Sequence, residues 1–137
     1  MDNCVVVNKT KNAVLASTAQ LAKTPWTRIK GLIGCSAEQF PPGKALWIMP
    51  SQGIHTIGMS FPIDVIYLDR AGRVVYACHR LPPFRIAAFN WRARSVIELP
   101  AGTLKQSSTS VGDEIVCKKN EGGCKLPPKI PTAAASK

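Results

Sequence analysis

The sequence has few acidic residues, no closely spaced cysteines and no long hydrophobic run. Its 137 residues carry 8 Asp and Glu against 18 Lys and Arg, a net charge of +10. Such an excess attracts anionic partners, although it also serves solubility. None of the five cysteines forms a C-x-x-C pair, which argues against a structural zinc site or a thioredoxin-like centre. We therefore expect neither a metal nor a cofactor.

The sequence also lacks the marks of export or membrane insertion. No apolar run approaches the ~20 residues that a membrane-spanning helix needs. The first residues contain neither the basic region nor the apolar core of a signal peptide. From these absences we expect no membrane span and a cytoplasmic protein with reduced cysteines.

The composition divides the chain into one domain and a tail. Residues 1–117 are predicted to form one compact domain, which is long enough to bury a core. From 118 to 137 the chain consists mainly of Lys, Gly, Pro, Ala and Ser, with five lysines against one glutamate. This segment is predicted to be a disordered basic tail.

Short apolar runs separated by turn residues dominate the domain, and each run is rich in β-branched or aromatic residues. The pattern predicts seven or eight strands, the clearest at 4–7, 13–16, 45–49, 63–68, 74–78, 95–99 and 115–117. The expected fold is mainly β, with α+β at the margin. We expect an antiparallel β sandwich or flattened barrel with one or two short helices.

The best helix signal lies at residues 24–34. Thr24 is a suitable N-cap, Pro25 suits the first helical position, and Gly34 falls just past the expected end. Gly31 weakens a helix unless another element approaches closely, so we expect tight contact between this helix and the sheet. A second, short helix is predicted from about Leu104 to Ser107.

The most apolar stretch, residues 54–69, contains two polar anomalies, His55 and Asp64. Pro62 lies between them and favours a bend, which would bring the imidazole close to the carboxylate. Such a pair is either a satisfied polar contact in the core or part of a functional pocket. Trp47 and Met49 are expected near His55, where their side chains suit a core or an apolar ligand site equally.

Several short motifs occur in a fixed order along the domain. They are Lys30-Gly31-Leu32, His55-Thr56-x-x-Met59, Ile63-Asp64-Val65-Ile66-x-Leu68-Asp69, Gly72-Arg73-Val74-Val75, Glu98-Leu99-Pro100-Ala101-Gly102 and Val111-Gly112-Asp113. This series resembles domain-of-unknown-function family 192 of bacteria and archaea, over roughly Val14 to Cys117. The resemblance implies a small, mainly β domain with no established activity. Lys30 departs from the pattern, because members of the family usually have arginine there.

An arginine-rich segment follows, from Arg80 to Arg94. Its arginines alternate with Phe84, Phe89 and Trp91, a combination that suits single-stranded nucleic acid or phosphorylated ligands. The alternative interpretation is a surface connection, in which the aromatic rings hold the loop to the sheet and the arginines are solvated.

Three functions remain open. The first is a ligand- or peptide-binding module, whose candidate binding residues are His55, Thr56, Met59, Asp64, Trp47, Glu98, Arg80 and Arg92. The second is an enzyme with His55 as general base, oriented by Asp64 or Glu98. We do not favour it, because its candidate nucleophiles have no recognisable catalytic setting; they are Ser60, Thr56 and Cys35. The third is nucleic-acid binding through the Arg80–Arg94 loop and the basic tail.

Overall fold

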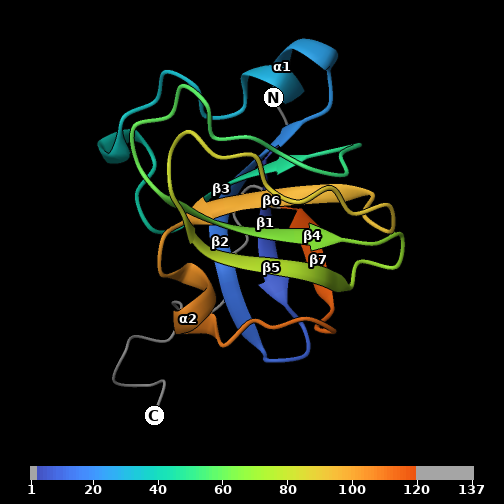
Figure 1. Cartoon of the computed structure of the whole chain (residues 1–137). Helices are drawn as coiled ribbons and strands as arrows, with labels where there is room; N and C mark the ends of the chain where they lie inside the picture. The colour runs from blue at the N-terminus through green and yellow to red at the C-terminus, as the bar shows by residue number, and fades with distance from the viewer. Residues whose placement is uncertain (1–2, 120–137) are drawn as a thin grey trace.

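The computed structural model describes residues 3–119 as a seven-stranded, curled sheet with short helices at its margins (Figure 1). The sheet order is β5-β4-β6-β3-β2-β1-β7. Neighbouring strands are antiparallel except β2 and β3, which are parallel. The strands are β1 (Asn3–Asn8), β2 (Ala13–Ala22), β3 (Lys44–Ile48), β4 (Ile63–Leu68), β5 (Val74–Leu81), β6 (Ser95–Pro100) and β7 (Ile115–Lys119). The mainly β fold predicted from the sequence is confirmed.

The helices are short: α1 (Pro25–Lys30), a 3-10 turn η1 (Ala37–Gln39) and α2 (Thr103–Ser107). Thr24 caps α1 as predicted, with its side chain accepting a hydrogen bond from the Thr27 amide. The predicted end at Gly34 is wrong, because Gly31 already has a φ of 50° and terminates the helix. The predicted tight contact is not what requires glycine at this position, because a Cβ added to Gly31 would lie 3.8 Å from Oε1 of Glu98 on β6, an ordinary van der Waals distance. The positive φ explains the glycine instead.

The curl brings the two edges of the sheet together at one end, where β5 begins and β7 begins. The amide of Ile115 donates to the carbonyl of Gly72 at 2.8 Å, and the amide of Val74 donates to the carbonyl of Asp113 at 2.9 Å. A Cβ on Gly72 would lie only 2.9 Å from the Ile115 oxygen, so a side chain there would force the edges apart. The sheet is therefore a half-barrel that hydrogen bonds close at one corner.

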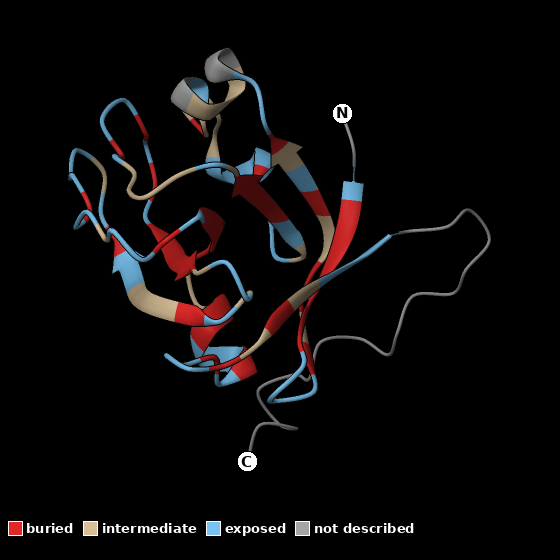
Figure 2. Ribbon diagram, turned by 90° about the vertical axis from the view of Figure 1, so that its right-hand side faces the viewer, coloured by how far each residue is buried: buried red, intermediate tan, exposed pale blue. Residues whose placement is uncertain are grey.

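Two apolar clusters lie on opposite faces of the sheet, and Figure 2 shows that the buried residues are concentrated in the strands. The inner cluster joins residues from both ends of the sheet order with Leu104 of α2, so it fills the curl. The outer cluster lies on β3, β4 and β6. Loop residues cover it, among them Leu32, Met59, Phe61, Ala87 and Ala93. Strands β4 and β6 are buried on both faces, which explains their nearly unbroken apolar sequences.

The carboxyl end of the predicted domain differs slightly from the expected boundary. Strand β7 includes Lys118 and Lys119, which the composition assigned to the tail. The rest of that predicted tail, residues 120–137, lies outside the described residues. Among residues 3–119, no helix is long and apolar enough to cross a membrane.

Candidate functional site

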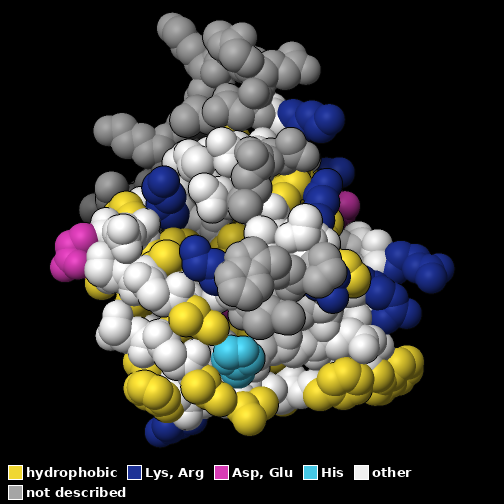
Figure 3. Space-filling model, turned by 90° about the horizontal axis from the view of Figure 1, so that it is seen from above, with side chains coloured by type: hydrophobic (Ala, Val, Ile, Leu, Met, Phe, Trp, Pro, Cys, Tyr) yellow, Lys and Arg dark blue, Asp and Glu magenta, His cyan; other side chains and the backbone are white. Residues whose placement is uncertain are grey.

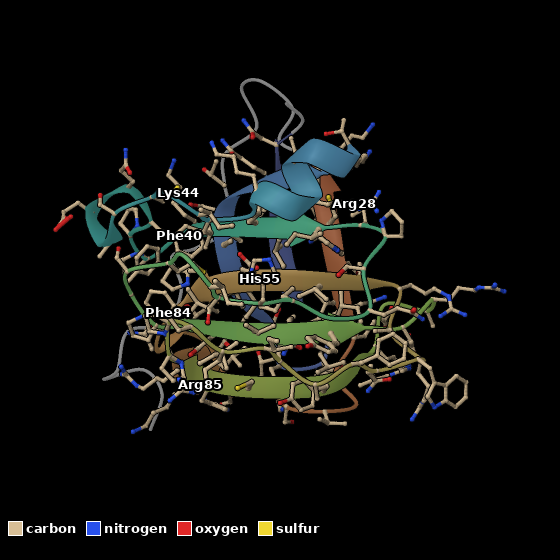
Figure 4. All side chains as sticks on the ribbon, turned by 45° about the horizontal axis from the view of Figure 1, so that its top comes forward. Arg28, Phe40, Lys44, His55, Phe84 and Arg85 are labelled. Carbon is tan, nitrogen blue, oxygen red and sulfur yellow. The ribbon has the colours of Figure 1, made fainter. Side chains whose placement is uncertain are left out.

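A pocket of about 320 Å³ opens on the outer face of the sheet, between α1 and the segment that contains His55. Its walls are largely apolar and include Ile48 and Met59. Four ionisable side chains line it as well, namely Arg28, Lys30, His55 and Glu98. Figure 4 shows Arg28 on α1 above the sheet and His55 on the loop in front of it. An apolar cavity with a few polar groups is the usual form of a small-molecule site.

Glu98 forms the buried part of this pocket. It lies near the middle of the sheet, paired with Leu46 on β3 and with Val65 on β4. Its exposed fraction is 2%, and its Oε1 atom has no hydrogen-bond partner among residues 3–119. Burial raises the pKa of Glu98 to about 8, so the carboxyl group is mostly protonated at neutral pH. A buried polar atom without a partner is uncommon, and in the described part of the chain only Trp47 Nε1 and Tyr67 Oη share this state; of the three, only Glu98 borders the pocket.

The local structure of α1 explains how the basic side chains reach the pocket. Thr24 and Thr27 form a reciprocal capping box, which fixes the first turn. Gly31 ends the helix directly over Glu98, so Arg28 and Lys30 fall in the last turn above the pocket. Within the described residues, neither forms an ion pair with Glu98. The pocket thus combines a cationic side with a carboxyl group that is mostly neutral.

The His55 segment is held in place by backbone contacts. A Cβ on Gly58 would lie 3.3 Å from Ile33, so the glycine permits close approach to the chain that follows α1. Thr56 is fully buried, and its hydroxyl donates to the Pro82 carbonyl at 2.7 Å and accepts from the Arg85 amide at 2.9 Å. Thr56 therefore joins two loops and does not line the pocket. His55 itself is exposed at the pocket wall.

Asp64 lies elsewhere, and the predicted contact with His55 is not formed. The Asp64 carboxylate accepts hydrogen bonds from the amides of Arg80 at 2.9 Å, Gly102 at 3.0 Å and Leu104 at 2.9 Å. Among the described residues, no hydrogen bond joins it to His55. Asp64 is fully buried and organises the start of α2. Its role in this structure is to satisfy backbone amides.

The other predicted binding residues also lie outside the pocket. Trp47 belongs to the inner cluster, on the opposite face of the sheet. Arg80 and Arg92 are exposed, and neither lines the pocket. The structure thus brings together His55, Met59 and Glu98 from the predicted set.

The sequence analysis did not identify Arg28 and Lys30 as site residues. The available signal was Gly31, whose position in a predicted helix indicated a close neighbour.

Other chemistry has less support in the described part of the chain. No group of three or more His, Cys, Asp and Glu residues is placed to hold a metal there. The three candidate nucleophiles, Ser60, Thr56 and Cys35, do not line the pocket with His55 and Glu98. Cys35 lines a second pocket of about 270 Å³ on the other side of Gly31, together with Phe40 and Lys44.

These features define a class of protein: a small domain with a curled β sheet and a partly polar pocket under its first helix. The chain belongs to domain-of-unknown-function family 192, described as Uncharacterized ACR, which matches residues 6–117.

Two relatives are UPF0127 proteins from archaea. The one from Thermococcus sibiricus is 29% identical over 92% of this chain and 82% of its own length. The one from Pyrococcus horikoshii is 32% identical over 81% of this chain and 96% of its own length.

Two solved structures share the fold. A protein of unknown function from Novosphingobium aromaticivorans has a TM-score of 0.70 and 17% identity, with 83% of each chain covered. A candidate transcription regulator from Sinorhizobium meliloti has a TM-score of 0.69 and 20% identity, covering 85% of this chain and 92% of its own. At these identities the likeness concerns the fold alone.

Proposed function

We propose that this protein is a binding module for a small organic ligand, and that the pocket between α1 and the His55 segment is its site. The observation that carries the proposal is Glu98, a fully buried carboxyl group with an unpartnered oxygen at a pocket wall. A group left in this state destabilises the fold. A ligand that forms hydrogen bonds with it would remove that penalty.

The charges around the pocket limit the ligand's chemistry. Because the pKa of Glu98 is raised to about 8, the neutral carboxyl both donates and accepts hydrogen bonds. A carbonyl or amide group is the matching partner. Arg28 and Lys30 on the same pocket attract an anionic group, while the isoleucine and methionine walls favour an apolar body. We therefore infer a small amphipathic anion with an amide or carbonyl function.

The test is a thermal-unfolding screen of the full chain against small carboxylates, phosphates and N-acyl compounds. A ligand at 100 times its Kd stabilises the folded state by about 2.7 kcal/mol, enough to shift the melting temperature measurably. We expect Glu98→Leu to abolish the response and Glu98→Gln to retain most of it, because glutamine is also neutral and hydrogen-bonding. Glu38→Gln, an exposed change on η1, is the control.

Each outcome decides a different part of the proposal. Loss of binding in Glu98→Gln would show that the ionised carboxylate is needed and that the ligand is cationic. Equal responses in the parent and Glu98→Leu would place binding outside this pocket. His55→Ala tests the rim, and we expect it to weaken binding without lowering the melting temperature greatly, because His55 is exposed.

A second candidate is a proton-transfer enzyme that uses the same pocket. His55 and Glu98 both line it, and a carboxyl with a pKa of about 8 suits general acid or base catalysis near neutral pH. Ligands found in the screen would be incubated with the protein and examined by mass spectrometry. Conversion by the parent but not by a Glu98→Gln variant that still binds would identify an enzyme. Unchanged ligands would leave binding as the function.

A further inference from the structure

Large hydrophobic side chains are concentrated on one exposed strip of the surface. Six are exposed in the described part of the chain, and five of these belong to two neighbouring loops. We call these five the apolar rim; they are Ile57 (48% exposed), Phe84 (66%), Ile86 (78%), Phe89 (70%) and Trp91 (73%). Figure 3 shows hydrophobic side chains gathered on the side of the molecule that also presents a histidine. Clusters of this kind mark interaction surfaces.

The loop that supplies most of the rim reverses the usual burial pattern. Its small residues Ala87 and Ala93 pack into the outer cluster, with 7% and 0% exposure. The large residues between and beside them point to solvent. Stability favours the opposite arrangement, because burying a phenylalanine or isoleucine gains far more than burying an alanine. Folding therefore does not explain the large side chains at these positions.

The backbone beneath the rim is fixed. The Thr56 amide donates to the Arg85 carbonyl at 2.7 Å, and the Phe84 amide donates to the Thr56 carbonyl at 3.0 Å. The Ala87 amide bonds to Ile54 in the same way at 2.9 Å. Phe84 has a φ of 61°, a left-handed conformation that is costly for a bulky residue and is seen most often at functional positions. Backbone hydrogen bonds thus fix the loop that carries the apolar rim.

The surroundings of the rim are strictly basic. Residues 70–97 contain six arginines and no aspartate or glutamate, and residues 51–61 contain no acid either. Arg85, Arg92 and Arg94 lie on the rim loop itself and are exposed. Among residues 3–119, the guanidinium groups of Arg85 and Arg94 bond only to nearby carbonyl groups, as Arg94 does to Trp91 at 3.1 Å. A partner that matches this surface therefore has negatively charged groups next to an apolar region.

From this combination we propose that the apolar rim docks onto an anionic phospholipid surface. Phosphates would pair with the arginines, and the rim side chains would enter the boundary between headgroups and acyl chains. Single-stranded nucleic acid fits less well, since Ile86 is the most exposed member of the rim and neither isoleucine has an aromatic face on which a base can stack. The proposal does not depend on the ligand pocket.

The test is flotation of the full chain with phosphatidylglycerol vesicles, with phosphatidylcholine vesicles and a single-stranded oligothymidylate as comparisons. We expect binding to the anionic vesicles, and a loss of about tenfold or more in partitioning for Ile86→Asn. The matched control is Val111→Asn, because Val111 is 62% exposed but lies in the turn before β7. Likewise Arg85→Gln should weaken binding more than Lys105→Gln on α2.

A second readout follows insertion directly. Brominated lipids should quench the fluorescence of Trp91, and since the chain has three tryptophans, Trp91→Phe assigns the signal. Failure of the parent to float with anionic vesicles, or equal flotation of Ile86→Asn and Val111→Asn, would overturn the proposal. Tighter binding to the oligothymidylate, sensitive to Trp91→Ala but not to Ile86→Asn, would overturn it in favour of a nucleic-acid surface.

Discussion

Asp64 and Glu98 are both single charges within apolar strands, yet they have opposite environments. The strands β4 and β6 are neighbours, and Glu98 pairs with Val65, the residue after Asp64. Asp64 receives three backbone amides, whereas Glu98 Oε1 receives no partner and borders a pocket. Similar sequence contexts therefore contain one carboxylate that satisfies backbone amides and one buried carboxyl group whose Oε1 has no partner in the described part of the chain. Four predictions test this difference.

The largest effect should appear in the pH dependence of stability. The unfolded state loses the Glu98 proton near pH 4.5, while the folded state holds it to about pH 8. Between these values the unfolded state binds fewer protons, so the free energy of unfolding should fall as the pH rises. Relative to Glu98→Gln, the fall should be on the order of 5 kcal/mol. Urea denaturation of both proteins across this range checks it. Parallel pH profiles would mean that Glu98 is solvated or paired.

Removing the Asp64 carboxylate should destabilise the folded state. Asp64→Ala leaves the amides of Arg80, Gly102 and Leu104 without their acceptor, and we expect a loss of about 3–5 kcal/mol. Asp69→Ala is the matched control, because Asp69 accepts two amide bonds in an exposed turn. Equal losses in the two variants, measured by chemical denaturation, would contradict the special role of Asp64.

The third prediction concerns Gly31→Ala, which places a methyl group over Glu98 and should weaken ligand binding in the pocket. Gly31→Ala strains a backbone with a φ of 50° and puts a Cβ 3.8 Å from the Glu98 carboxyl, so we expect a loss of about 1–3 kcal/mol. Gly34→Ala shares the positive φ but has open space around it. Only Gly31→Ala should weaken the ligand response in the thermal screen. Equal weakening in both would indicate a backbone effect alone.

The smallest effect concerns a third carboxylate, Asp113, which is paired with a charge. Burial alone would raise the pKa of Asp113, but hydrogen bonds from Asn8 and Lys11 outweigh it and lower the pKa below its usual 3.8. Lys11→Met removes the 2.8 Å ion pair and should cost about 1 kcal/mol or less.

The sign of this effect is opposite to that of Glu98. The difference between the parent and Lys11→Met should be present above the ordinary pKa of an aspartate and should vanish as Asp113 is protonated at lower pH. The exposed Lys9→Met provides the comparison by denaturation. A difference that persists in acid would indicate lost packing of the lysine stem.

Much of the fold could be predicted because it depends on local patterns. The apolar runs of β4 and β6 and the turn residues between strands identify strands without reference to distant parts of the chain. The N-cap of α1 at Thr24 could also be predicted from the local sequence. In contrast, the parallel pairing of β2 with β3 depends on which distant strands meet, and no local pattern encodes it.

The candidate site was less predictable for the same reason. The carboxylate of Asp64 is satisfied by amides 38 and 40 residues further along the chain, so a neighbouring histidine was the only visible partner in the sequence. Glu98 was recognised as an anomaly, but its open pocket arises from Gly31 and α1, which lie far from it in sequence. The predicted peptide-binding, nucleic-acid and catalytic roles stay predictions.

The pairing of β1 with β7 has a consequence for synthesis on the ribosome. Cys4 pairs with Lys119 and Asn8 with Ile115, so the first strand to emerge obtains its outer neighbour last. Until β7 leaves the exit tunnel, the outer edge of the valine-rich strand β1 is unpaired in the nascent chain. Such an edge can recruit other chains. The edge of β1 is therefore most open to pairing with other chains during the stage of translation before β7 emerges.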